Sequence, residues 1–234
     1  KARRLRFLPL PSIGSNHADM QVRRLAVEVP SDCPLRADDI AWALSGALVG
    51  LRKRFDVVGV FMTALVAATG GGLIRDGVLL QTIPPVLTNP LYLPLVAATT
   101  MFAIALAKRL HNARKLETLI ELVDAVGTPA FAVVSVEFAR QANLPLPGVL
   151  LVGCVGGVGG GVLRDILVRE IPEIMQPGRY LAILVALSCA LYMILTIGFS
   201  LPSAPVAWGA VAFYFCVRLL TVRMDWRTRA VLGE

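Results

Sequence analysis

Long apolar stretches separated by short polar segments dominate the chain after residue 34. A helix needs about 20 mostly apolar residues to cross the hydrocarbon core of a bilayer. The pattern therefore predicts an all-α integral membrane protein with seven transmembrane helices, at residues 39–51, 57–80, 91–106, 119–138, 147–168, 180–199 and 206–222. The first of these is the shortest.

Both ends of the chain are polar and basic. Residues 1–34 contain four prolines and several arginines but no long apolar run, which predicts a disordered tail. Residues 223–234 form a second basic tail after the last apolar stretch.

Composition agrees with a membrane location. Hydrophobic residues make up 56% of the chain and charged residues 17%, with a mean hydropathy of +0.69. Soluble domains average about 45–50% apolar and about 25% charged residues. The net charge of +7 does not point to nucleic-acid binding, because the basic residues gather at the ends of the apolar stretches.

The distribution of lysine and arginine predicts an orientation. Basic loops stay in the cytoplasm, and one side of the predicted bundle carries nearly all of them: Arg52, Lys53, Arg54, Lys108, Arg109, Arg114, Lys115, Arg169, Arg179, Arg218, Arg223, Arg227 and Arg229. The short loops of the other side contain only Arg140. We therefore expect a cytoplasmic C-terminus and an N-terminus outside.

One motif occurs twice inside the apolar stretches. Gly70-Gly71-Gly72-Leu73-Ile74-Arg75-Asp76 recurs 89 positions later as Gly159-Gly160-Gly161-Val162-Leu163-Arg164-Asp165. Flanking residues match at the same offset, including Trp42 with Phe131, and at an offset of 88 after the motif, including Tyr92 with Tyr180. The matches indicate an internal duplication.

The duplication predicts the topology. Residues 35–110 and 118–199 each contain three predicted helices, and an odd number turns the second copy upside down in the membrane. The helix at residues 203–222 has no counterpart.

The glycine triplets have two possible meanings. Three glycines weaken a helix, and backbone groups freed within a bilayer must meet protein or water; this favours broken or kinked helices that line a polar cavity. Small residues also let two helices pack closely, which needs no cavity. The sequence leaves both interpretations open.

The charged pairs that follow the triplets need partners. A single charge at the bilayer centre costs about 2.5–3.5 kcal/mol on insertion scales. Because neighbouring residues do not face each other on a helix, we expect Arg75 to pair with Asp165, and Arg164 with Asp76, across a pseudo-twofold axis. A purely architectural ion-pair cluster is the alternative.

Other polar groups add to this candidate site. Ser45, Thr69 and Thr128 are expected to join the charged pairs along a pore, whereas Asp124 and Glu137 fall at predicted helix ends, where water would solvate them. The sequence contains no catalytic motif and no typical metal-binding or cofactor-binding spacing. We therefore predict that the chain is not an enzyme.

With these motifs the chain resembles the prokaryotic trimeric intracellular cation (TRIC) channels, a family also labelled as glycine transporters. The resemblance rests on the doubled motif, on Trp42-Ala-Leu-Ser-Gly46, on Arg52-Lys-Arg-Phe-Asp56 and on Asn89-Pro-Leu-Tyr92, and it covers about residues 35–222. It implies a homotrimer in the bacterial inner membrane. Each subunit would conduct K⁺ and Na⁺ past second and fifth helices kinked at the glycine triplets.

Three functions are compatible with the residues. A passive cation channel is the leading hypothesis. A secondary transporter for a small solute such as glycine is the second, because inverted repeats with discontinuous helices also suit alternating access. A membrane scaffold without transport is the third.

Overall fold

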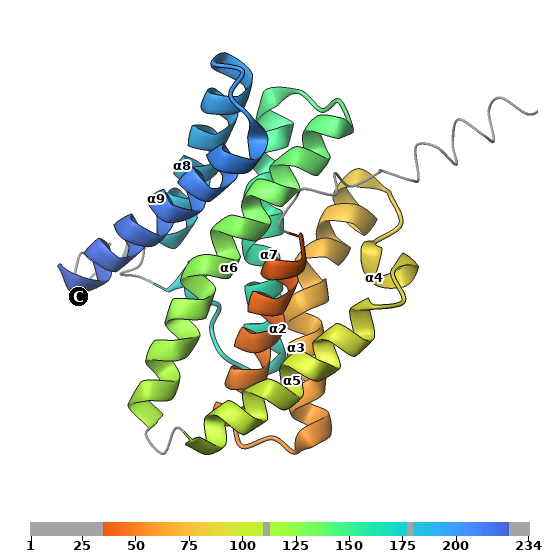
Figure 1. Ribbon diagram of the computed structural model, residues 1–234, viewed down its shortest axis with the longest axis vertical. Helices are drawn as coiled ribbons and strands as arrows, with labels where there is room; N and C mark the ends of the chain where they lie inside the picture. The colour runs from red at the N-terminus through yellow and green to blue at the C-terminus, as the bar shows by residue number, and fades with distance from the viewer. Residues whose placement is uncertain (1–34, 110–112, 177–179, 225–234) are drawn as a thin grey trace, which may run out of the picture.

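The computed structural model describes residues 35–109, 113–176 and 180–224, which form a bundle of helices with no β-strand (Figure 1). The sequence predictions for residues 1–34 and 225–234 lie outside these ranges. Within them the predicted fold class, an all-helical protein, is confirmed.

The first half contains three long helices. They are α2 (Leu35–Arg52), α3 (Val57–Gly72), which continues as the π-helix η1 (Leu73–Leu80), and α5 (Tyr92–Arg109). The short helix α4 (Pro85–Thr88) precedes α5.

The second half repeats this order and adds one helix. It contains α6 (Ala113–Gln141), α7 (Leu146–Leu167) and α8 (Leu181–Met193), which continues as the π-helix η3 (Ile194–Gly198). The 3₁₀ turn η2 (Glu173–Met175) precedes α8, and α9 (Ser203–Arg223) follows η3.

Every predicted apolar span falls on a helix of the structure. By length and composition, five helical segments of the described residues qualify as membrane-crossing: Val57–Leu80, Ala113–Gln141, Leu146–Leu167, Leu181–Gly198 and Ser203–Thr221. The length and composition of these segments are those of membrane-spanning helices.

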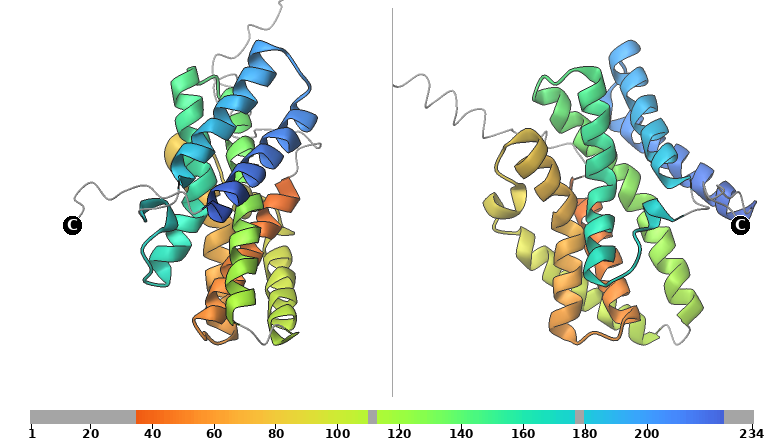
Figure 2. Two further views of the ribbon diagram at one scale, coloured as in Figure 1. Left: turned by 90° about the vertical axis from the view of Figure 1, so that its left-hand side faces the viewer. Right: turned by 180° about the vertical axis from the view of Figure 1, so that it is seen from behind.

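Four helices form the centre of the bundle. α2 packs against α3 and α6, and α7 packs against α3 and α6. α5 covers α2 and α3 on one side, whereas α8 and α9 cover α6 on the other (Figures 1 and 2). The centre is therefore built from the first two long helices of each half.

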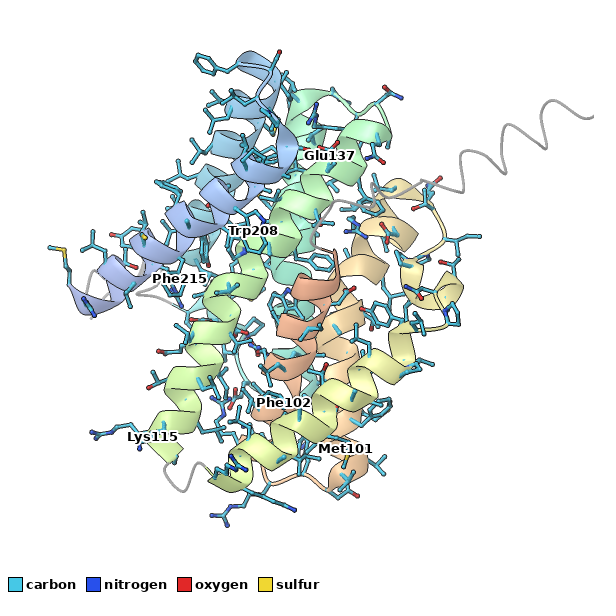
Figure 3. All side chains as sticks on the ribbon, in the orientation of Figure 1. Met101, Phe102, Lys115, Glu137, Trp208 and Phe215 are labelled. Atoms are coloured by element: carbon cyan, nitrogen blue, oxygen red, sulfur yellow. The ribbon has the colours of Figure 1, made fainter. Side chains whose placement is uncertain are left out.

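The outer helices present large apolar side chains to the surroundings. Met101 and Phe102 of α5 are about three-fifths exposed, and Trp208 of α9 is 57% exposed (Figure 3). Soluble monomers rarely expose extensive apolar surface. The outward faces therefore suit contact with lipid or with another protein chain.

Unusual backbone positions recur in the two halves. Arg54, after α2, and Asn143, after α6, have left-handed φ angles of 60° and 56°. Gln81 and Arg169, which follow η1 and α7, have φ angles of 54° and 58°. The first two residues are 89 positions apart and the second two are 88 apart, the offsets at which the sequence repeats. The turns of the two halves are thus built alike.

Candidate functional site at the crossing of α3 and α7

The two glycine triplets meet where α3 and α7 cross. A Cβ atom at Gly71 would lie 2.6 Å from the carbonyl oxygen of Gly156, and one at Gly159 would lie 3.2 Å from the Cα of Gly71. A Cβ at Gly160 would overlap the carbonyl oxygen of Ala67. The two backbones are in direct contact, so the close-packing interpretation of the glycines is correct.

The contacts at the crossing are reciprocal. Gly71 faces Gly156 just as Gly160 faces Ala67. Residues 71 and 160, and likewise 67 and 156, are 89 positions apart. The crossing therefore relates equivalent residues of the two halves to each other.

The interpretation that a glycine triplet breaks its helix does not hold for α7. This helix continues without interruption from Leu146 to Leu167, through its triplet. In α3 the α-helix ends at Gly72 and widens into the π-helix η1. An unbroken helix keeps its backbone hydrogen bonds, which water cannot replace within lipid. Tight packing against the partner helix compensates for the weak helix propensity of glycine.

Arg75 pairs with the aspartate next to it. Its Nε lies 2.6 Å from Asp76 Oδ1 and its Nη2 lies 2.8 Å from Asp76 Oδ2, a two-pronged contact between two fully buried side chains. The guanidinium carbon also lies 4.0 Å from the ring centroid of Phe138 and 5.2 Å from that of Phe131. Ser135 Oγ of α6 lies 3.5 Å from Nη1. The guanidinium group thus has a carboxylate and two aromatic rings as favourable neighbours.

Arg164 has a larger set of partners. Its Nε and Nη2 lie 2.9 and 2.8 Å from Asp165 Oδ1, and its Nη1 lies 2.9 Å from Asp124 Oδ2 on α6. Nη1 also donates a hydrogen bond to Ser45 Oγ of α2, and the guanidinium carbon lies 5.8 Å from the ring centroid of Trp42. This arginine therefore joins α2, α6 and α7.

The prediction of cross-axis ion pairs is wrong. Arg75 and Arg164 each bind the following aspartate of their own helix, not the aspartate of the other half. Cβ atoms of adjacent helical residues diverge, but the long arginine side chain turns back far enough for its guanidinium group to reach the neighbouring carboxylate. The glycine triplets of the two motifs meet at the crossing of α3 and α7.

Each charged pair adjoins a water-sized cavity. The first cavity, of about 20 Å³, is lined by Asp39, Ala68, Thr69, Gly72, Leu73, Arg75, Pro84, Pro85, Val86, Tyr92 and Phe131. The second, also about 20 Å³, is lined by Trp42, Asp124, Thr128, Val158, Gly161, Val162, Arg164, Asp165, Glu173, Ile174 and Leu181. Most of these residues correspond at the repeat offsets: Arg75 to Arg164, Gly72 to Gly161 and Phe131 to Trp42. The two halves thus hold equivalent cavities.

A larger acidic cavity opens beside the second of these. It has a volume of about 290 Å³ and is lined by Val49, Arg52, Glu117, Ile120, Glu121, Asp124, Arg164, Asp165, Glu170, Ile171, Glu173 and Gln176. Asp124, Arg164, Asp165 and Glu173 line both this cavity, here called the vestibule, and the second small cavity. These four residues form the boundary between them.

Ion pairs hold the walls of the vestibule. Glu170 accepts a hydrogen bond from Arg52, and its Oε1 lies 2.7 Å from Lys53 Nζ. These two ion pairs connect the segment after α7 to the end of α2. Partial burial would raise the pKa of Glu170, but the hydrogen bond from Lys53 and the positive charges of Arg52 and Lys53 outweigh it and lower this pKa below its usual value. Arg218 of α9 pairs with Glu173, whose backbone N–H lies 3.3 Å from Asp165 Oδ2.

The remaining predicted site residues have different roles. Ser45 contacts Arg164, and Thr128 lines the second small cavity. Thr69 lines the first, although its hydroxyl binds the Leu65 carbonyl oxygen of its own helix at 2.7 Å. Among the described residues, no group of three or more His, Cys, Asp or Glu side chains is arranged to hold a metal ion.

The prediction that water solvates Asp124 at a helix end is wrong. The helix α6 begins 11 positions earlier, at Ala113, and the Asp124 side chain is buried against Arg164. Glu137 is half-buried and binds Arg140 at 3.0 Å and the Tyr192 hydroxyl at 3.2 Å. The sequence signal that could have located Asp124 is Arg164, because an arginine within an apolar stretch needs carboxylates to compensate its charge and one of them can come from another helix.

Known proteins resemble both the sequence and the fold. The glycine transporter family model matches residues 39–108 and 121–196. A UPF0126 membrane protein of Deinococcus radiodurans is 40% identical over 136 residues, which are 58% of this chain and 62% of that protein. The inner membrane protein YadS of Escherichia coli K12 is 36% identical over 140 residues, 59% of this chain and 66% of that protein. The matches thus span a little less than two thirds of these relatives.

A solved structure extends the likeness to the fold. The TRIC trimeric intracellular cation channel orthologue from Rhodobacter sphaeroides superposes with a TM-score of 0.75 at 27% identity, over 82% of this chain and 97% of that one. The family model covers well over half of the chain, and the fold agrees with the solved channel. The chain therefore belongs to the glycine transporter family of membrane proteins, the family of the prokaryotic TRIC channels.

Proposed function

We propose that this protein is a homotrimeric, potassium-permeable cation channel with a pore inside each subunit. The observation that carries the proposal is the pair of equivalent cavities beside the buried arginines of the two motifs, one of which adjoins an acidic vestibule, in a chain similar to TRIC channels. Arginine and aspartate are costly within a membrane, and where they occur they usually mark an ion or proton pathway.

The pore would run past the glycine crossing. Its walls would include Arg75 and Asp76 on one side and Arg164 and Asp165 on the other, with bends at the triplets Gly70–Gly72 and Gly159–Gly161. The small cavities hold about one water molecule each, so this arrangement is a closed pore. Opening would require α3 and α7 to shift against each other.

The proposal includes seven membrane crossings arranged as two inverted three-helix repeats and a seventh helix. The reciprocal contacts of Gly71 and Gly160 support it, as do the matching left-handed turns. The ends carrying Lys53 and Lys115 would face the cytoplasm of a bacterial inner membrane, with the C-terminus on the same side. The trimer is proposed because the similar channel is described as trimeric.

A carrier for glycine is the second candidate. The family model is described as a glycine transporter, and equivalent cavities in two halves also suit alternating access. The two small cavities beside the motifs do not hold an amino acid in the present conformation, and the likeness to a solved cation channel favours the channel.

Reconstitution of the purified protein distinguishes these functions. A channel gives unitary currents in planar bilayers and K⁺ flux that follows the K⁺ gradient without saturating at low concentration. A carrier gives saturable [¹⁴C]glycine uptake without unitary currents. Protein that produces neither signal would favour the scaffold and overturn the proposal.

A further inference from the structure

The vestibule leads from the end of the bundle that carries Lys53 toward the buried Arg164. Six carboxylates and two arginines line it. Lys53 and Arg218 pair with Glu170 and Glu173 from outside the lining, so the lining itself carries more carboxylates than cationic groups. A cleft with an excess of one charge raises the local concentration of counter-ions, here cations.

Asp124 occupies the narrow end of this vestibule. It lines both the 290 Å³ vestibule and the 20 Å³ cavity beyond it, and its side chain is nine-tenths buried. It comes from α6, whereas Arg164 and Asp165 come from α7. An ion that moved between the two cavities would therefore pass Asp124.

The charges at this narrow end of the vestibule, here called the neck, do not cancel. Arg164 contributes one positive charge, and Asp165 binds it through two nitrogens at 2.9 and 2.8 Å. Asp124 adds a second carboxylate at 2.9 Å from Nη1. One negative charge is therefore left where water is scarce and screening by salt is weak.

We infer that Asp124 is the residue that makes the pore selective for cations over anions. The inference rests on the proposed channel function and adds a selectivity-determining residue that lies outside the repeated motif. Carboxylates at a constriction select cations in many channels, because they attract cations and repel anions. The vestibule carboxylates would concentrate cations in front of this point.

The test compares three neutral variants in planar bilayers. Asp124→Asn removes the charge at the neck, and Arg164 keeps Asp165 as its partner. Glu117→Gln removes an exposed charge from the vestibule wall. Glu137→Gln removes the same charge from the opposite end of α6 (Figure 3).

Reversal potentials in a tenfold KCl gradient give the selectivity. An ideally cation-selective pore reverses at about 59 mV, and we expect the wild type and Glu137→Gln to lie near that limit. Asp124→Asn is expected to shift the reversal potential toward zero both in dilute and in molar salt. Glu117→Gln is expected to lower the conductance severalfold in dilute salt only, because the Debye length falls to about 3 Å at 1 M.

The outcomes separate this inference from the channel proposal. Wild-type protein without current overturns both. If the wild type is cation-selective and Asp124→Asn has the same selectivity, only the role of Asp124 is overturned. A loss of selectivity in Glu137→Gln as large as that in Asp124→Asn overturns it as well.

A second variant covers the case in which Asp124→Asn does not assemble. Asp124→Ser also removes the carboxylate, while its hydroxyl oxygen can still accept a hydrogen bond and Arg164 keeps Asp165 as its partner. It is expected to shift the reversal potential toward zero, and a pore of wild-type cation selectivity in this variant would contradict the inference.

Discussion

At the scale of single residues, the two arginines of the repeated motif are equally buried but differently supported. Among the residues that the structure describes, Arg75 has one carboxylate within ion-pair distance, Asp76, and two aromatic rings. Arg164 has Asp165 and Asp124. Removal of one partner of a buried ion pair leaves an uncompensated charge and typically costs about 3–5 kcal/mol. The two motifs should therefore tolerate the same substitution differently.

We predict that Asp76→Asn destabilises the protein more than Asp165→Asn. The first should lose about 3–5 kcal/mol, whereas the second should lose clearly less because Asp124 still compensates Arg164. Unfolding by denaturant in mixed micelles measures the difference. Exchange of Arg75 and Asp76 together for Met and Leu removes both charges and should recover part of the loss. Equal destabilisation by the two single variants would contradict this account.

Glu170 gives a prediction for pH. Its pKa is lowered in the folded protein, so its ion pairs with Arg52 and Lys53 stabilise the fold above the unfolded pKa of 4.5. This stabilisation is lost as the pH falls from 4.5 through the lower pKa of the folded state. The melting temperature of the wild type should thus exceed that of Glu170→Gln at pH 7, and the gap should narrow as the pH falls below 4.5. A gap that is constant with pH would mean that the charge of Glu170 is not responsible.

At the scale of helices, the crossing of α3 and α7 depends on the absence of Cβ atoms at Gly71 and Gly160. Their closest neighbours are backbone carbonyl oxygens, which cannot move aside as a side chain can. Any added atom must therefore push the two helices apart. Because equivalent residues meet here, the crossing also joins the two halves of the chain.

We predict that Gly71→Ala and Gly160→Ala each weaken the protein by about 1–3 kcal/mol, the typical cost of overpacking. The same substitutions should reduce the conductance, since they alter the proposed pore. Gly209→Ala is the matched control, because a Cβ there would have no neighbour within 4 Å. That variant should be neutral or more stable by about 0.5–1 kcal/mol, the usual advantage of alanine within a helix. Wild-type stability and wild-type current in Gly71→Ala and Gly160→Ala would contradict the role assigned to the triplets.

At the scale of the whole molecule, the exposed apolar faces and the arrangement of charged ends decide how the protein sits in a membrane. Lys115 lies near one end of α6 and Glu137 near the other (Figure 3). The exposed Met101, Phe102 and Trp208 lie on outer helices, where lipid or neighbouring subunits would cover them.

We predict that the Lys115 end of α6 faces the cytoplasm. In a variant whose native cysteines are replaced by serine, a cysteine at Lys115 should react with a membrane-impermeant maleimide only after the cells are permeabilised. A cysteine at Asn143, in the turn after α6, should react in intact cells. The reverse pattern would invert the proposed orientation.

The sequence alone determined the helices and their duplication. Runs of apolar residues of bilayer length leave helix as the main way to satisfy the backbone, so the predicted spans fall on helices. The constant offsets of 89 and 88 positions indicated a duplication, and the structure has matching turns at Arg54 and Asn143 and matching cavities around Arg75 and Arg164 that agree with it.

Only the tertiary structure decided which groups satisfy the buried charges and what the glycines do. Helical spacing gives the directions of the Cβ atoms. The guanidinium group lies several bonds beyond the Cβ, so its partner depends on how the side chain and the surrounding helices pack. The burial of Asp124 depends on α2, α6 and α7 meeting around Arg164, which the order of residues along one helix does not encode. The glycines were ambiguous for the same reason: the absence of a Cβ weakens a helix when it stands alone, but permits contact when a second glycine-rich helix packs against it.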